Sequence, residues 1–260
     1  MIETRRLSIG YSVKEGKSKL IKESINVRLI PGEVTCLMGR NGAGKSTLIR
    51  TLGGFIPALS GEILLEDRPA DSFSNEEKAR RLGVVLTDKT NAGGITVFEL
   101  VSLGRHPHTN FFGVLKDKDK SVITSSMEKV GIAHKSDAYL SELSDGERQK
   151  AMIAKVLAQE CPVILLDEPT AFLDLNSRIE VMELLRKLAL EEHKTILLST
   201  HDIESALRLG SRIWLMDKEK DFLSGTPEEL VGSGLFDSYF DLEKYPGWSG
   251  KNYVRIMNEL

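Results

Sequence analysis

The stretch Gly-Arg-Asn-Gly-Ala-Gly-Lys-Ser-Thr, residues 39–47, decides the fold class of this 260-residue chain. It matches the phosphate-binding P-loop pattern G-x-x-x-x-G-K-[ST], in which glycines let backbone amides surround a phosphate. The terminal Lys45 supplies a charge for the β- and γ-phosphates, and the Ser46 hydroxyl suits Mg²⁺. We predict that these residues bind a nucleotide: Gly39, Arg40, Asn41, Gly42, Ala43, Gly44, Lys45, Ser46 and Thr47.

The sequence on either side of the loop supports this prediction. Residues 34–38 form an apolar run typical of a buried strand, and residues 46–50 are typical of the first turn of a helix. A P-loop requires this order of strand, loop and helix, because the helix N-terminus adds its positive dipole end to the nest of amides. A glycine-rich turn that binds nothing is the alternative, and the flanking sequence disfavours it.

Composition sets the broad class. Hydrophobic residues make up 41% of the chain and charged residues 28%, which is ordinary for a globular protein. The formal charge of −3 is not that of a protein that coats nucleic acid. No apolar run approaches the roughly 20 residues of a membrane span, and residues 1–6 lack the apolar stretch of a signal peptide. We therefore expect a cytoplasmic protein, and we expect Cys36 and Cys161 to be buried free thiols.

The order of the expected elements indicates an α/β protein. Residues 2–9 and 24–30 alternate like strands, whereas residues from about 95 to 160 carry helical spacing. The runs at 163–166 and 195–198 are continuously apolar, as parallel strands buried on both faces are. The segment 176–192 between them is expected to be a helix, which completes a βαβ unit.

Two carboxylates follow the strand at 163–166. Asp167 at the strand end is suited to contact Mg²⁺, directly or through water. Glu168 beside it is suited to act as the general base that orients and deprotonates an attacking water. An acidic turn or helix cap is the alternative, but the presence of a P-loop in the same chain favours a role of the two carboxylates in hydrolysis.

A helix is expected to begin in the stretch Leu-Ser-Asp-Gly-Glu-Arg-Gln-Lys, residues 143–150. Ser144 is a natural N-cap, and Glu147 three residues later completes a capping box. Taken alone, these two residues are explained by capping.

Taken together with the P-loop, the stretch resembles the signature motif of the ATP-binding cassette (ABC) family. The P-loop lies about 100 residues upstream and the strand carboxylates about 20 residues downstream, as in that family. Asp174 resembles the aspartate of the family's D-loop, and His201 the switch histidine that contacts the γ-phosphate. Tyr11 resembles the aromatic residue that stacks on adenine. Alone, Tyr11 could equally be a surface aromatic of a strand, and His201 could cap a helix.

The resemblance implies how the parts work. In this family two subunits hold two ATP molecules between them, head to tail, with Mg²⁺. Ser144 and Gly146 would then face the γ-phosphate on the other subunit's P-loop, where the start of their helix offers amides to an anion. Lys45, Glu168 and His201 would be the catalytic residues.

The resemblance also implies a single ATPase domain over residues 1–260, with no nucleic acid among its partners. Its core would be a P-loop NTPase (RecA-like) α/β unit with a mostly parallel sheet, from residues 1–87 and 161–235, carrying an N-terminal antiparallel β subdomain. Residues 88–160 would form an inserted helical subdomain that carries the signature, and residues 236–260 a C-terminal segment.

One position departs from the family pattern. A glutamine usually ends the strand before the helical subdomain, in the Q-loop, and here Thr87 stands where it is expected. The threonine hydroxyl could reach Mg²⁺ or its water, but the side chain is shorter and stiffer than glutamine. Asp88 is the alternative replacement.

The segment that follows resembles the ATPases of importers for ferric siderophores, haem and cobalamin. It comprises residues 94–101 and 103–107. That resemblance implies docking of the helical subdomain on a separate membrane permease, a location on the inner face of the membrane, and a substrate-binding protein in the full system. The stretch at 111–113, Phe-Phe-Gly, could line the dock or pack in the subdomain core. His106 and His108 are weak evidence for a metal site.

Alternatives remain for the function and for the tail. A soluble ATPase of iron–sulfur cluster assembly is the second functional hypothesis, and the importer-like segment argues against it. The cargo does not follow from the sequence, because the ATPase does not touch it. Six of the 16 aromatic residues lie in the tail, where they either pack on the core or form a contact surface: Phe236, Tyr239, Phe240, Tyr245, Trp248 and Tyr253.

Overall fold

The computed structural model describes residues 1–12, 18–87, 94–110, 112–245 and 249–250. Its centre is a six-stranded sheet in the order β11-β10-β4-β9-β8-β7, and every neighbouring pair is parallel except β10 with β11. The strands are β4 (Val34–Met38), β7 (Leu82–Val85), β8 (Val163–Leu166), β9 (Thr195–Thr200), β10 (Arg212–Leu215) and β11 (Leu223–Gly225). The predicted core with a mostly parallel sheet is confirmed.

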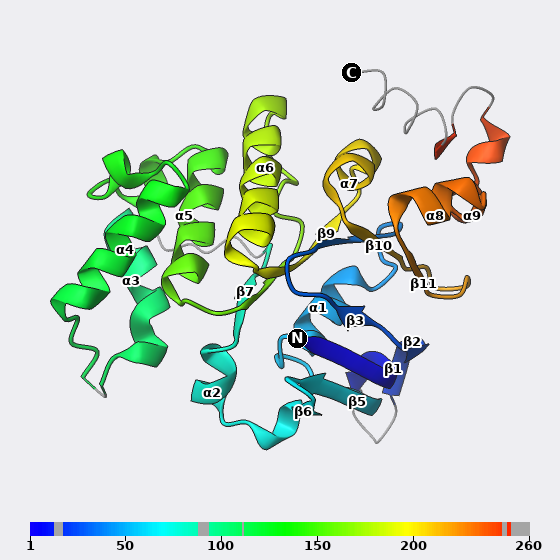
Figure 1. The fold of residues 1–260 in the computed structure, drawn as a ribbon, viewed down its shortest axis with the longest axis horizontal. Helices are drawn as coiled ribbons and strands as arrows, with labels where there is room; N and C mark the ends of the chain where they lie inside the picture. The colour runs from blue at the N-terminus through cyan, green and yellow to red at the C-terminus, as the bar shows by residue number, and fades with distance from the viewer. Residues whose placement is uncertain (13–17, 88–93, 111, 246–248, 251–260) are drawn as a thin grey trace.

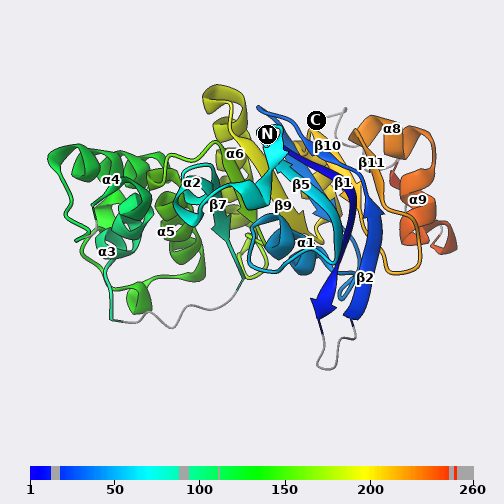
Figure 2. The same ribbon diagram turned by 90° about the horizontal axis from the view of Figure 1, so that it is seen from below.

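The sheet is covered on both faces, which explains its continuously apolar strands. Alternate residues of β4 point to opposite faces of the sheet: Cys36 and Met38 belong to one core cluster, and Leu37 belongs to the other. The first cluster takes side chains from α6 (Leu175–Glu192) and α7 (Ile203–Leu209). The second takes them from α1 (Lys45–Leu52), which lies between the two sheets of the protein (Figure 2).

The second sheet is the predicted antiparallel β subdomain. Its order is β2-β1-β5-β6, with β3 also paired to β1. The strands are β1 (Ile2–Ser12), β2 (Ser18–Ile25), β3 (Arg28–Leu29), β5 (Ser60–Leu65) and β6 (Arg68–Pro69). The expected strand at 24–30 was wrong in its bounds, since β2 begins at Ser18 and ends at Ile25, and a separate short strand, β3, follows. β2 is an edge strand with seven of its eight residues exposed or half-buried, so it lacks the alternating pattern of a half-buried strand.

The helices α3, α4 and α5 gather at one end of the molecule, away from the antiparallel sheet (Figure 1). This predicted helical subdomain comprises α3 (Val97–Ser102), η3 (Leu103–His108), α4 (Asp117–Lys129), η4 (Ala133–Lys135), η5 (Leu140–Glu142) and α5 (Asp145–Ala158). Thr96 caps α3 and Ser144 caps α5, each in a capping box with a glutamate three residues on. Outside the subdomain, α2 (Asn75–Ala79) and η2 (Ala70–Ser72) lead into β7.

An ion cluster around the buried Arg105 side chain holds the helical subdomain together. The Arg105 side chain is 3% exposed, and its Nε donates to Asp119 Oδ1 at 3.0 Å. Its Nη1 donates to Glu160 at 2.6 Å and to the Ala158 carbonyl at 2.7 Å. The ring of His108 hydrogen-bonds the Gln159 carbonyl at 2.9 Å. These contacts join η3 and α4 to the end of α5.

The last described elements, α8 (Pro227–Gly232), α9 (Leu235–Phe240) and η6 (Leu242–Lys244), lie at the opposite end of the molecule (Figure 1). The predicted C-terminal segment, residues 236–260, begins within α9. Phe236 and Tyr239 are buried, so core packing holds for these two tail aromatics. The ammonium of Lys220 donates to the carbonyls of Ser238 and Tyr239. Tyr245 is 60% exposed, and Trp248 and Tyr253 lie outside the described residues.

Cys36 and Cys161 are buried free thiols, as predicted. Burial raises the pKa of each to about 12, because a thiolate would be desolvated there. Within the part of the chain that the structure covers, no helix is long and apolar enough to cross a membrane.

Candidate active site

The predicted P-loop joins β4 to α1 and lines a cavity of about 280 Å³. Gly42 and Gly44 have φ angles of +78° and +107°, which side chains rarely adopt. A Cβ on Gly44 would also approach Ile21 of β2 too closely, at 2.4 Å from its Cγ2. The cavity wall is formed by Tyr11, Ile21, Asn41, Gly42, Gly44, Lys45, Ser46, Thr47 and Glu168. The loop thus meets residues from three other parts of the chain.

Lys45 lines this cavity and is 5% exposed. Its ammonium donates to the carbonyl of Gly39 at 2.9 Å and lies 3.7 Å from Glu168 Oε1. A buried lysine needs such partners, because an unpaired charge away from water is costly. The structure therefore brings the predicted phosphate-binding lysine and the predicted general base to one site.

Tyr11 at the end of β1 borders the same cavity. Its hydroxyl and that of Thr47 share a hydrogen bond of 2.9 Å, and the tyrosine is 44% exposed. A half-exposed ring at the rim of a phosphate site is placed to stack on a nucleotide base.

The turn after β8 carries the two carboxylates. Asp167 is 3% exposed, and its Oδ1 accepts a hydrogen bond of 2.8 Å from Ser199 Oγ. The backbone N–H of Glu168 donates to that same hydroxyl at 2.8 Å, and Glu168 has a φ of +47°. This strained conformation persists because contacts from neighbouring strands fix it.

Thr87, two residues beyond β7, donates its hydroxyl to the Asp167 carbonyl at 2.7 Å. The threonine at the expected glutamine position thus contacts the backbone of the carboxylate turn. Asp88, the alternative replacement, lies outside the described residues.

The donor chemistry of the site fits Mg²⁺. This ion prefers hard oxygen ligands, and in nucleotide sites it takes few from the protein because phosphates and waters supply the rest. The Ser46 hydroxyl and the Asp167 carboxylate are such oxygens. Ser46 lines the P-loop cavity, Asp167 lines a second cavity, and Glu168 lines both. Among the described residues, no cluster of three or more His, Cys, Asp or Glu offers a cation an all-protein site.

Ser144, Gly146 and Asp174 do not line the P-loop cavity. Ser144 caps α5 and Asp174 caps α6, where the Asp174 carboxylate accepts hydrogen bonds from the amide and hydroxyl of Ser177. These bonds lower the pKa of Asp174. A Cβ on Gly146 would lie 2.9 Å from Ser177 Oγ, so the starts of the two helices are in close contact. Ser144 and Asp174 are exposed and Gly146 is buried, so the starts of α5 and α6 lie together outside the lining of the P-loop cavity.

His201 directly follows β9 and is exposed. The next residue, Asp202, caps α7 and pairs with Arg178 of α6 at 3.2 Å. Burial opposes ionisation of Asp202, but hydrogen bonds from Ser205 and Arg178 lower its pKa. His201 is not among the residues that line the P-loop cavity.

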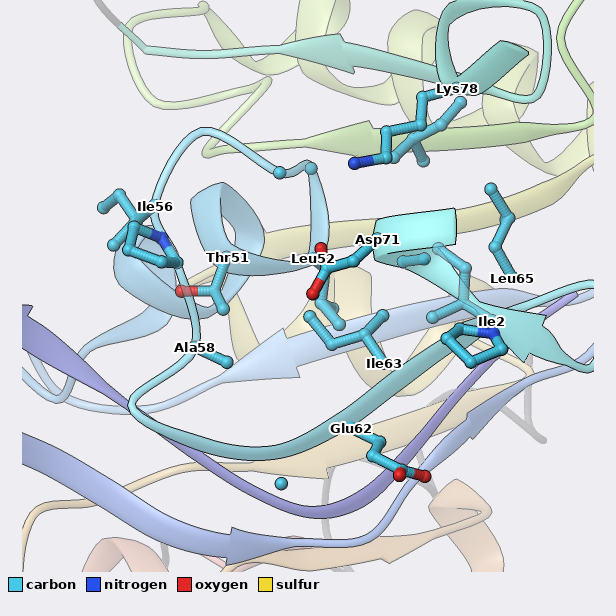
Figure 3. Close-up of a pocket in the computed structure, with 17 residues that line it drawn as sticks. Ile2, Thr51, Leu52, Ile56, Ala58, Glu62, Ile63, Leu65, Asp71 and Lys78 are labelled. Atoms are coloured by element: carbon cyan, nitrogen blue, oxygen red, sulfur yellow. The ribbon is translucent and has the colours of Figure 1, made fainter. Parts of the chain in front are cut away.

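Two further cavities border the core. One of about 80 Å³ lies between α5 and the carboxylate turn and is lined by Thr87, Gln149, Asp167 and Glu168 among others. The other, of about 520 Å³, lies away from the P-loop, between the end of α1, β5 and the segment from β6 to α2. Figure 3 shows Leu52, Ile63, Asp71 and Lys78 among the residues around it.

Sequence reasoning missed Ser199 and Ile21. Ser199 directly follows the apolar residues 196–198 of β9, and this change from apolar to polar was the available signal for a polar contact at the end of that strand. Ile21 lies on the edge strand β2, whose residues gave no periodic pattern.

The family model described as ABC transporter matches residues 23–171. The chain belongs to the ABC transporter family, and with its P-loop and strand carboxylates it is an ATPase. It is 39% identical over 243 residues to an uncharacterised ABC transporter ATP-binding protein of Methanocaldococcus jannaschii, covering 94% of this chain and 82% of the relative. It is 37% identical over 237 residues to the ferric enterobactin transport ATP-binding protein FepC of Escherichia coli, covering 91% and 86%.

Solved structures give the same family. An inward-facing ABC transporter described as of the metal-chelate type matches with a TM-score of 0.79 and 27% identity, over 92% of this chain and 88% of that one. A dimeric bacterial ABC transporter cassette matches with a TM-score of 0.75 and 25% identity, over 87% and 98%. The predicted resemblance to the importer group is confirmed, and these similarities favour it over the iron–sulfur assembly alternative.

Proposed function

We propose that this protein is the ATP-hydrolysing subunit of an importer for a chelated metal compound of the ferric siderophore, haem or cobalamin type. The observation that carries the proposal is the convergence of Lys45, Glu168 and Tyr11 on one cavity. The ferric enterobactin relative and the metal-chelate type transporter support the choice of cargo class.

In the proposed reaction, water attacks the γ-phosphorus of ATP, and ADP and phosphate leave. The amides of the P-loop and the Lys45 ammonium hold the phosphates, and the ring of Tyr11 stacks on adenine. Glu168 accepts the proton of the attacking water, and His201 hydrogen-bonds the γ-phosphate. Ser46 and Asp167 would hold Mg²⁺, which would supply positive charge against the phosphate oxygens.

Two copies of the chain are proposed to complete each site. The α5 N-terminus, with Ser144 and Gly146, would supply amides and a positive dipole end to the γ-phosphate on the other copy. Its position on a surface apart from the P-loop suits a partner's site better than its own. The dimeric bacterial cassette supports a homodimer. ATP binding would close the two copies together, and hydrolysis would release them.

A separate permease is the proposed membrane partner, and it would place the ATPase on the inner face of the membrane. Phe112 of the helical subdomain is 83% exposed, which favours the docking role of this residue over core packing. Phe111 lies outside the described residues. Phe55, 61% exposed next to the 520 Å³ cavity, offers a second apolar contact. A substrate-binding protein would deliver the cargo on the other side.

Affinity purification tests this proposal. Tagged Glu168→Gln protein is purified with ATP from detergent-solubilised membranes of its own cells, and its partners are identified by mass spectrometry. Recovery of a polytopic permease is expected, and a Phe112→Glu companion variant should recover less of it. Recovery of soluble partners alone would contradict the importer and favour iron–sulfur assembly.

A further inference from the structure

The carboxylate turn after β8 is attached to β7 at two consecutive points. The Asp167 amide donates to the Val85 carbonyl at 2.8 Å, which continues the ladder between the strands. The Asp167 carbonyl then accepts the Thr87 hydroxyl at 2.7 Å. The backbone on the N-terminal side of Glu168 is therefore fixed by a side chain outside the strand ladder.

The same turn is fixed from β9 on its other side. Ser199 Oγ accepts the Glu168 amide and donates to Asp167 Oδ1, both at 2.8 Å. Two hydroxyls, that of Ser199 in β9 and that of Thr87 just beyond β7, thus hold the peptide unit between Asp167 and Glu168, where Glu168 adopts its φ of +47°. A non-glycine residue keeps such a conformation when its surroundings over-determine it, so each hydroxyl contributes to where the Glu168 carboxylate points.

A hydroxyl has one proton to donate, and Thr87 donates it to the Asp167 carbonyl. A glutamine at this position would have carried two amide donors on a longer side chain. In this chain the polar group at the end of β7 is therefore engaged with the protein backbone, where it orders the turn.

We propose that Thr87 is a positioning residue for ATP hydrolysis. Its hydroxyl holds the Asp167 carbonyl and thereby fixes the turn that directs Glu168 into the P-loop cavity, 3.7 Å from the Lys45 ammonium. This inference rests on the proposed role of Glu168 as general base. It predicts that loss of the hydroxyl lowers kcat and leaves nucleotide affinity unchanged.

Thr87→Val removes the hydrogen bond and keeps the branched shape, and Thr87→Ser keeps the hydroxyl. The matched control is Thr109→Val, which removes a bond from a threonine hydroxyl to the His106 carbonyl, in the helical subdomain. The measurements are kcat and KM for ATP, the Kd of a non-hydrolysable ATP analogue, and Tm. Thr87→Ala is the second variant if the valine variant does not fold.

We expect Thr87→Val to lower kcat about fivefold or more, as loss of one hydrogen bond of ordinary strength allows. The analogue Kd should stay within about twofold, and Thr87→Ser and Thr109→Val should retain the wild-type kcat. A Thr87→Val kcat equal to that of Thr109→Val would overturn the inference, as would an equal loss in Thr87→Ser. A parallel Glu168→Gln variant separates the positioning role of Thr87 from the general-base role of Glu168. Wild-type turnover of that variant would refute the general-base role.

Discussion

The ammonium of Lys45 lies 3.7 Å from the carboxylate of Glu168, although the two residues belong to different motifs that are far apart in the sequence. The lysine also donates to the Gly39 carbonyl at 2.9 Å. When phosphates bind, they offer the ammonium stronger partners of opposite charge. Nucleotide binding would thus loosen the hold of Lys45 on Glu168 and leave the carboxylate to accept a proton from water.

This relationship predicts opposite effects of the two single variants. Glu168→Gln should bind ATP as tightly as wild type or tighter, because it removes a negative charge near the phosphates, and should lose at least about a hundredfold in kcat. Lys45→Ala should weaken ATP binding about tenfold or more, since it removes a charge-assisted contact. Turnover assays and nucleotide titrations measure both effects.

Glu204→Gln is the charge-matched control for Glu168→Gln, since Glu204 is an exposed residue of α7 outside the cavity lining. It should keep both kcat and affinity. Wild-type turnover of Glu168→Gln, or wild-type affinity of Lys45→Ala, would contradict the roles given to these residues.

Tyr11 allows its ring and its hydroxyl to be tested separately. The hydroxyl bonds Thr47 at 2.9 Å, whereas stacking on a base needs the ring alone. Tyr11→Phe should therefore keep the affinity for ATP and ADP within about threefold, and Tyr11→Ala should lower it about tenfold, the scale of one base–aromatic stack. Titration with the two nucleotides measures this, and an equal loss in both variants would assign the effect to the hydroxyl.

The features that could be predicted from the sequence were short motifs whose function depends on neighbouring residues in the chain. The P-loop, the carboxylates after an apolar run and the capping box of Ser144 with Glu147 each occupy fewer than ten residues, and the chemistry of each motif restricts which residue types can form it. Burial of Cys36 and Cys161 followed from their apolar neighbours in the same way.

The parts that sequence missed depend on contacts between distant segments. Ser199 of β9 and Thr87, just beyond β7, hold the carboxylate turn from its two sides, and neither contact follows from a short pattern. The bounds of β2 were missed because its stability comes from pairing with β1, while most of its side chains face solvent. The positive φ of Glu168 follows from the same long-range contacts.

The ion cluster around Arg105 predicts acid sensitivity of the helical subdomain. The Lys116 amide and the Arg105 guanidinium lower the pKa of Asp119. Burial opposes ionisation of Glu160, but its hydrogen bond to Arg105 lowers its pKa as well. A carboxyl with a depressed folded pKa stabilises the fold above its unfolded pKa, about 3.9 for Asp and 4.3 for Glu, and loses this contribution as pH falls through the folded value.

Tm should therefore fall as pH decreases from about 5 to 3, and Asp119→Asn should reduce this dependence. Arg105→Met should destabilise the protein by about 3 kcal/mol at pH 7, because it leaves the buried carboxylate of Asp119 without its charged partner. Thermal unfolding across this pH range is the measurement. A surface pair, Arg80 with Glu76, provides the control, and Arg80→Met should cost less than about 1 kcal/mol. Equal costs for the two arginines would contradict the argument.

The surface at the start of α5 is proposed to face the γ-phosphate on a second copy, and Ser144 allows that role to be separated from helix capping. Serine, aspartate and asparagine are comparable N-caps, so Ser144→Asp and Ser144→Asn should both keep α5 intact. They differ in charge alone, and a negative charge at this point would repel a phosphate. In a Glu168→Gln background with ATP, we expect the asparagine variant to dimerise and the aspartate variant to remain monomeric in analytical ultracentrifugation. Equal dimerisation of both would place the γ-phosphate away from Ser144, and monomers in both would mean that the serine hydroxyl itself is required.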